Sequence, residues 1–62
     1  MQSEVLSPDH VERAALRVIA DKGADAASFA DARIIQRREH DDRQSVEIWT
    51  AVRNRIAELT TG

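Results

Sequence analysis

The chain has 62 residues, a net charge of −2 and no cysteine, so it can hold one small domain at most and cannot form disulfides or cysteine-based zinc sites. Apolar residues make up 42% of it and charged residues 32%, a balance typical of a globular domain rather than a disordered acidic tail. No apolar run reaches the roughly 20 residues of a membrane span, and the first residues lack the features of a signal peptide, so we expect a cytoplasmic protein.

The chain is predicted to be one all-α domain preceded by a short arm. Residues 1–6 show neither a cap nor a helical period, and we expect a flexible N-terminal arm there. Residues 7–60 are predicted to form a small three-helix bundle. No stretch alternates between apolar and polar residues as a strand would, so we expect no sheet. The charge is divided unevenly, with six acidic against three basic residues in 1–31 and five acidic residues against six arginines in 32–62. This asymmetry is too mild to indicate a nucleic-acid surface by itself.

The first helix is predicted over 8–22. Ser7 can cap its free N–H groups, and Pro8 suits the first helical position because it has no N–H to leave unpaired. Lys22 and Gly23 predict its end, since a cation favours the last turn and glycine readily takes the left-handed conformation. The apolar residues of this segment recur on one helical face: Val11, Ala14, Ala15, Val18 and Ile19.

Two more helices are predicted over 26–38 and 43–59. Asp25 is expected to cap the first of them, which is rich in alanine, and either Asp41 or Asp42 to cap the second. The short polar break between them predicts that they are antiparallel neighbours. The expected core is Val11, Ala15, Val18, Ile19, Phe29, Ala30, Ile34, Trp49, Val52, Ile56 and Leu59.

Two segments carry a resemblance to a known group of proteins. The first is Lys22-Gly23-Ala24-Asp25-Ala26, and the second is Asp41-Asp42-Arg43-Gln44-Ser45-Val46-Glu47-Ile48-Trp49-Thr50-Ala51-Val52, with Leu59 closing. The chain resembles a loose family of short, uncharacterised, all-helical proteins common in alphaproteobacteria. In the family pattern glycines stand where this chain has Asp41 and Ser45, and isoleucine stands at Val52. The resemblance implies a bacterial all-helical protein and no particular activity.

Catalytic and metal chemistry find little support in the sequence. In an up-down-up bundle, the start of the first helix with His10 and the loop with His40-Asp41-Asp42 lie at the same end. These side chains are therefore candidates for a metal site. Capping alone also explains the aspartates, because aspartate is common at helix starts. The sequence has no glycine-rich phosphate loop, and no serine or threonine has a general base at the spacing of a known catalytic motif. We therefore expect no enzymatic activity, no cofactor and no metal site.

Binding is the remaining class of function. The residues that could contact a partner are two apolar side chains off the main helical faces, a tryptophan that so small a domain seldom buries completely, and three arginines of the second helix: Leu16, Ile35, Trp49, Arg33, Arg37 and Arg38. The leading hypothesis is a small protein–protein interaction or adaptor module, with a homodimer or an unknown protein as partner. The alternative is an arginine-mediated binder of nucleic acid or another acidic ligand, which the acidic residues of the third helix disfavour. The simpler interpretation of the arginines is a solvated face, with Arg37 paired to Asp41 and Arg43 paired to Glu39 or Glu47.

Overall fold

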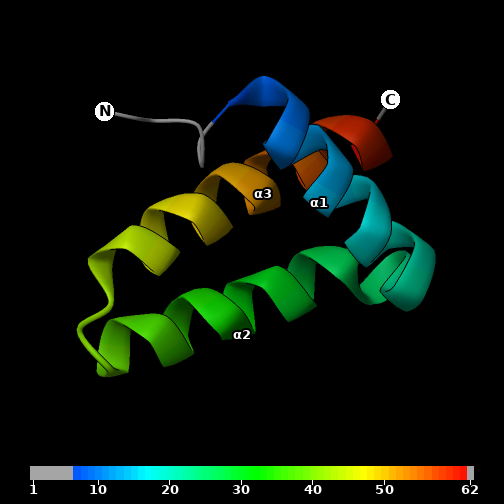
Figure 1. The fold of residues 1–62 in the computed structure, drawn as a ribbon. Helices are drawn as coiled ribbons and strands as arrows, with labels where there is room; N and C mark the ends of the chain where they lie inside the picture. Colours follow the sequence, from blue (N-terminus) through cyan, green and yellow to red (C-terminus); the bar gives the residue numbers. More distant parts are fainter. Residues whose placement is uncertain (1–6, 62) are drawn as a thin grey trace.

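The computed structural model describes residues 7–61, and this part of the chain is almost entirely helical. Helix α1 spans Pro8–Lys22, a 3-10 turn η2 spans Gly23–Asp25, α2 spans Ala26–Glu39, and α3 spans Arg43–Thr61 (Figure 1). No strand occurs among the described residues, so the all-α prediction is confirmed. The arm expected at residues 1–6 lies outside the described part.

Both ends of α1 form as the sequence predicts. The Ser7 side chain accepts a hydrogen bond from the backbone N–H of His10 at 3.3 Å, and Pro8 occupies the first turn. At the other end Gly23 has φ +58° and ψ −125°, and its N–H donates to the carbonyl of Ile19. A positive φ at this position favours glycine, because other residues meet steric strain there.

The prediction that Asp25 caps α2 is wrong. A capping residue needs an extended backbone, but Asp25 has φ −92° and ψ 7°, and its side chain makes no capping hydrogen bond. The 3-10 turn runs directly into α2 instead, with the N–H of Ala26 donating to the carbonyl of Gly23. The backbone of the turn thus supplies an acceptor for the first N–H of α2.

Asp41 and Asp42 have different roles in the α2–α3 connection, because Asp41 ends α2 and Asp42 caps α3. The N–H of Asp41 donates to the carbonyl of Arg38 at 3.0 Å, and that of Asp42 to the carbonyl of Arg37 at 2.9 Å. This pair of bonds is a Schellman motif, in which Asp41 holds the positive-φ position with φ +57°. The Asp42 carboxylate then accepts from the N–H of Ser45 at 3.2 Å and caps α3, so of the two expected caps Asp42 is correct and Asp41 is not.

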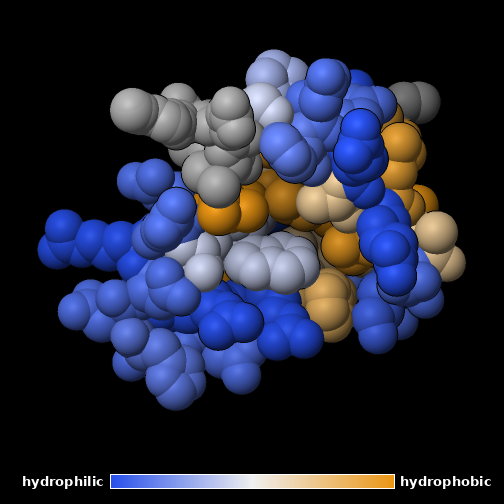
Figure 2. Space-filling view, in the orientation of Figure 1, coloured by the Kyte–Doolittle hydropathy of each residue, from blue (hydrophilic) through white to orange (hydrophobic). Residues whose placement is uncertain are grey.

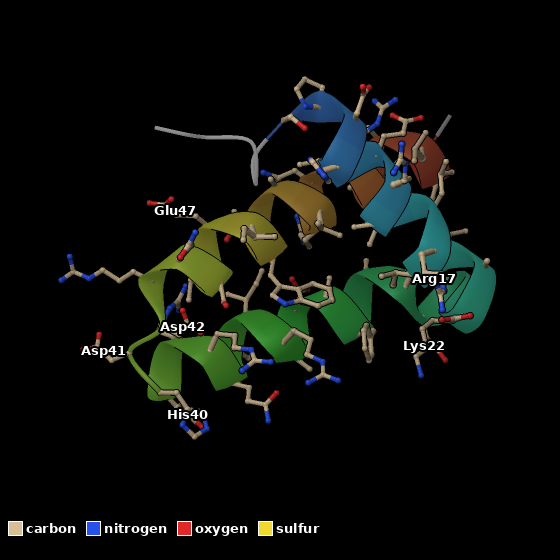
Figure 3. The ribbon with its side chains drawn as sticks, in the orientation of Figure 1. Arg17, Lys22, His40, Asp41, Asp42 and Glu47 are labelled. Carbon is tan, nitrogen blue, oxygen red and sulfur yellow. The ribbon has the colours of Figure 1, made fainter. Side chains whose placement is uncertain are left out.

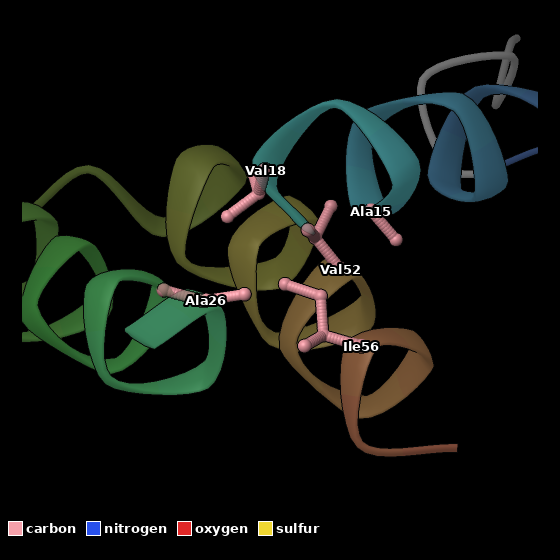
Figure 4. Packing of buried hydrophobic residues seen from close by; sticks show 6 residues of the cluster. Ala15, Val18, Ala26, Val52 and Ile56 are labelled. Atoms are coloured by element: carbon pink, nitrogen blue, oxygen red, sulfur yellow. The ribbon is translucent and has the colours of Figure 1, made fainter. Parts of the chain in front are cut away.

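Helices α2 and α3 run antiparallel side by side, and α1 lies across them, against the second half of α3 (Figure 1). Figure 4 shows Val52 and Ile56 of α3 between α1 and the start of α2. The fully buried large side chains are these two, and burying each contributes about 1.5–3 kcal/mol. The remaining buried residues are small or medium-sized: Ala15, Val18, Ala26 and Ala30.

The core is smaller than the sequence predicts. Leu59 was expected to close it but is 36% exposed, and five more of the expected core residues are only half-buried: Val11, Ile19, Phe29, Ile34 and Trp49. α1 crosses α3 instead of running along its length (Figure 1), and Leu59 near the end of α3 lies outside the buried cluster. On the face shown in Figure 2, apolar residues remain visible between α1 and the α2–α3 pair, while hydrophilic residues cover the region of the α2–α3 connection.

Candidate functional site

Large apolar side chains that the core does not cover are the first candidates for a binding surface. Ile35 on α2 is 55% exposed and Leu16 on α1 is 49% exposed, and both were singled out in the sequence. Leu59 near the end of α3 is a third exposed apolar side chain. The sequence analysis instead placed it in the core, on the same helical face as Val52 and Ile56. Their role in binding stays a prediction.

Ile35 borders an open hollow of about 390 Å³ on α2. The hollow is lined by Phe29, Ala32, Arg33, Ile35, Gln36 and Glu39. Ala32 and Ile35 lie on the side of α2 opposite the buried Ala26 and Ala30, because the residues of a helix advance by about 100° each. The exposed isoleucine therefore stands on the outer face of α2, beside a small residue that leaves room for another side chain.

Arg33 and Trp49 meet through Phe29. The Arg33 guanidinium carbon lies 5.1 Å from the centre of the Phe29 ring, and the Lys22 ammonium lies 4.8 Å from the same ring. The rings of Phe29 and Trp49 pack edge to face at 5.9 Å. Trp49 thus packs against the core, whereas Arg33, held also by a 3.1 Å hydrogen bond to Gln36, borders the Ile35 hollow. Such cation–π contacts contribute about 0.5–1 kcal/mol at exposed sites.

The structure separates the other two arginines of α2. Arg37 is half-buried, and its Nε lies buried without a hydrogen-bond partner in the described structure. Arg38 is exposed and borders a different hollow, of about 340 Å³, beside Asp41, Asp42 and Glu47. The three arginines therefore do not combine into one cationic surface, and acidic groups surround the most exposed of them. The expected pairing of Arg37 with Asp41 is not among the ion pairs of the described residues.

Ion pairs that the sequence analysis did not predict connect the helices. Arg53 Nε of α3 lies 3.0 Å from Asp31 Oδ1 of α2. Arg55 of α3 lies 2.6 Å from Glu12 of α1 and 2.9 Å from Glu58. Hydrogen bonds to Glu58 and Glu12 raise the pKa of Arg55 above its ordinary value. Spacings of 22 and 43 residues along the chain carry no local signal, so only the packing of the helices reveals these pairs.

Leu16 occupies a separate surface. It borders an open hollow on the outer side of α1 with Arg13, Ala14 and Arg17. Arg17 and Asp21, four residues apart on α1, form an exposed ion pair at 3.7 Å. The hollow beside Leu16 and the hollow beside Ile35 have no lining residue in common, so these two exposed side chains lie on separate surfaces of α1 and α2.

The α2–α3 connection gathers titratable side chains without forming a metal site. His40, Asp41 and Asp42 lie at the end of the molecule away from Lys22 (Figure 3), and the start of α1, which carries His10, lies beside the second half of α3 (Figure 1). Among residues 7–61, no group of three or more histidine, aspartate or glutamate side chains could hold a metal ion. Hydrogen bonds from Ser45, with added influence from Arg37 and His40, lower the pKa of Asp42 below its ordinary value of 3.8.

Comparisons with known proteins add no relative. No protein-family model matches the chain, and neither the curated proteins nor the solved structures contain a match. No helix in the described part of the chain is long and apolar enough to cross a membrane. Any function must therefore be argued from the surfaces described above.

Proposed function

We propose that this chain is a small, non-catalytic protein–protein interaction module that binds its partner through the outer face of α2. The observation that carries the proposal is the position of Ile35, which is 55% exposed beside a hollow above Ala32. Covering the exposed part of an isoleucine contributes about 1 kcal/mol, which the folded monomer leaves unused. Hydrophobic side chains beside a shallow hollow are what a helix or loop of a partner can cover.

The composition of the core supports this proposal. A domain of this size is only marginally stable and usually needs a disulfide, a metal or a partner chain. Cysteine is absent, and five of the six buried residues are alanine or valine, whose side chains are smaller than that of Ile35. An apolar surface that a partner covers would add to this small core.

The arginine-mediated alternative receives less support. Arg33, Arg37 and Arg38 were its candidate residues, but one lies over Phe29, one is half-buried and one lies among acidic side chains. A phosphate backbone would meet the three carboxylates of Asp41, Asp42 and Glu47 along with Arg38 and Arg43. A nucleic acid or another polyanion is therefore not the partner that we propose. The resemblance to short alphaproteobacterial proteins stays a prediction and carries no function of its own.

Photo-crosslinking in the native cell tests the proposal. A crosslinking amino acid at Gln36, which is exposed and borders the hollow, should give a discrete protein adduct. The same amino acid at Asn54, exposed on the outer side of α3, should give none. The adduct should disappear with Ile35→Glu and persist with Thr50→Glu, which introduces the same charge at an exposed position of α3. Absence of an adduct at Gln36, or equal adducts at both positions, would contradict the proposal.

A further inference from the structure

The outer face of α2 has the residue spacing of a helix–helix seam. Ser28, Ala32, Ile35 and Glu39 are all exposed and follow one another at intervals of four, three and four residues. This spacing places them in a single row along the helix, as in the a and d positions of a coiled coil. The row faces away from α1 and α3, and Ile35 is its one large apolar residue.

The row is complementary to itself when two copies lie antiparallel. A two-fold axis midway between Ala32 and Ile35 places each Ile35 over the Ala32 of the other copy. The large side chain then enters the hollow of about 390 Å³ that the small residue leaves open. Both Ile35 side chains are covered by the same operation, which a single copy cannot achieve.

The charges beside the row match the same arrangement. Asp31 and Arg38 flank the row on one side, seven residues apart, and equivalent flanking positions of antiparallel helices face each other. Arg38 of each copy therefore meets Asp31 of the other, which gives two ion pairs across the axis. Arg38 has no ion-pair partner among the described residues of its own chain. Asp31 is held by Arg53, but its side chain is half exposed, and a carboxylate can accept from a second guanidinium.

From these observations we propose that the partner of the α2 outer face is a second copy of this chain, with the two α2 helices antiparallel. The inference rests on the proposed function and names the occupant of the same surface. One helix from each copy makes a small interface, so the dimer forms at micromolar or higher concentrations of protein. A heterologous partner with a different charge pattern would not need Asp31 and Arg38 to match each other.

Charge reversal with purified protein tests the arrangement. Sedimentation equilibrium between about 10 µM and about 1 mM should show the native chain as a monomer–dimer mixture. Arg38→Asp places two Asp–Asp contacts across the axis and Asp31→Arg places two Arg–Arg contacts, so each variant alone should dimerise at least about tenfold more weakly. An equimolar mixture of the two variants should dimerise again, because both contacts then join opposite charges. Arg13→Asp, at an exposed position of α1, is the matched control and should leave the native behaviour unchanged.

Rescue in the mixture also shows that the variants are folded, which their far-ultraviolet circular dichroism should confirm separately. A native chain that stays monomeric at about 1 mM, or single variants that dimerise as well as the native chain, would overturn the second copy as the partner. If Gln36 nevertheless crosslinks a different protein in the cell, the proposed function stands and only this inference falls. If Gln36 gives no adduct and the purified chain is monomeric, both fall.

Discussion

The two connections between the helices both turn the chain at a residue of positive φ, but they use different residues to do so. Each reverses the chain through one residue of positive φ, Gly23 at +58° after α1 and Asp41 at +57° after α2. In the first connection glycine adopts this conformation without steric cost, and the next helix starts without a side-chain cap. In the second a non-glycine residue bears the strain, and Asp42 caps the next helix. Aspartates stand before the next helix in both turns, but they have unrelated roles.

The largest expected effect is at Gly23. No atom lies within 4 Å of a Cβ added there, so Gly23→Ala tests the backbone conformation alone. We expect it to lower the free energy of unfolding by about 1–2 kcal/mol, or several degrees in melting temperature for a domain of this size. Urea denaturation followed by circular dichroism measures the change. Asp25→Ala is the control and should stay within about 0.5 kcal/mol of the native chain, since the Asp25 side chain makes no cap. A larger loss of unfolding free energy in Asp25→Ala than in Gly23→Ala would contradict these roles.

The opposite sign is expected at Asp41. Asp41→Gly removes the strain of a side chain at φ +57°, against the greater chain entropy of glycine in the unfolded state. The net gain should be about 0.5–1 kcal/mol, measured by the same denaturation. Asp41→Ala keeps the strained backbone and should give no gain. Equal stability of the glycine and alanine variants would show that the conformation of this residue carries no cost.

The smallest expected effect concerns the cap and its dependence on pH. Asp42→Ala should lower the melting temperature at neutral pH, by less than Gly23→Ala does, because the N–H of Ser45 loses its acceptor. Asp42→Asn keeps an acceptor and should retain most of the stability. The pKa of Asp42 is lowered in the folded chain, so its contribution is complete above the unfolded value near 3.8 and is lost as the pH falls through the lower folded value. The difference between native and alanine chains should therefore shrink in strong acid, and a difference that grows there would contradict this assignment.

Local signals predicted most of the helix boundaries. α1 begins and ends as Ser7, Pro8 and Gly23 indicated, and α3 begins at the predicted residue. The error at Asp25 has a physical cause, since a capping residue type predicts a cap only where the backbone is extended, and the 3-10 turn prevents that. For Asp41 the sequence pattern indicated a cap and not the positive φ that the structure shows, because aspartate before a helix is typical of a capping residue.

The sequence predicted individual residues of the candidate site but not which of them share a surface. The displacement of Ile35 from the apolar face of its helix predicted its exposure, because angular position on a helix follows from the sequence alone. The grouping of Leu16, Ile35 and Trp49, and of the three arginines, could not be predicted in this way. It depends on how α1 crosses the α2–α3 pair, and that crossing leaves Leu16 and Ile35 on different surfaces.

The helices of this protein follow from local sequence signals, because caps, glycine and apolar period act within a few residues of one another. The shared core, the charges that pair between helices and the uncovered face of α2 follow only from how the helices pack. Those outcomes depend on the steep crossing of α1 over α3 (Figure 1), which joins Glu12 to Arg55 and leaves Leu59 partly exposed. A crossing is set by the shapes of packed side chains from distant segments, and no local pattern in the sequence records it.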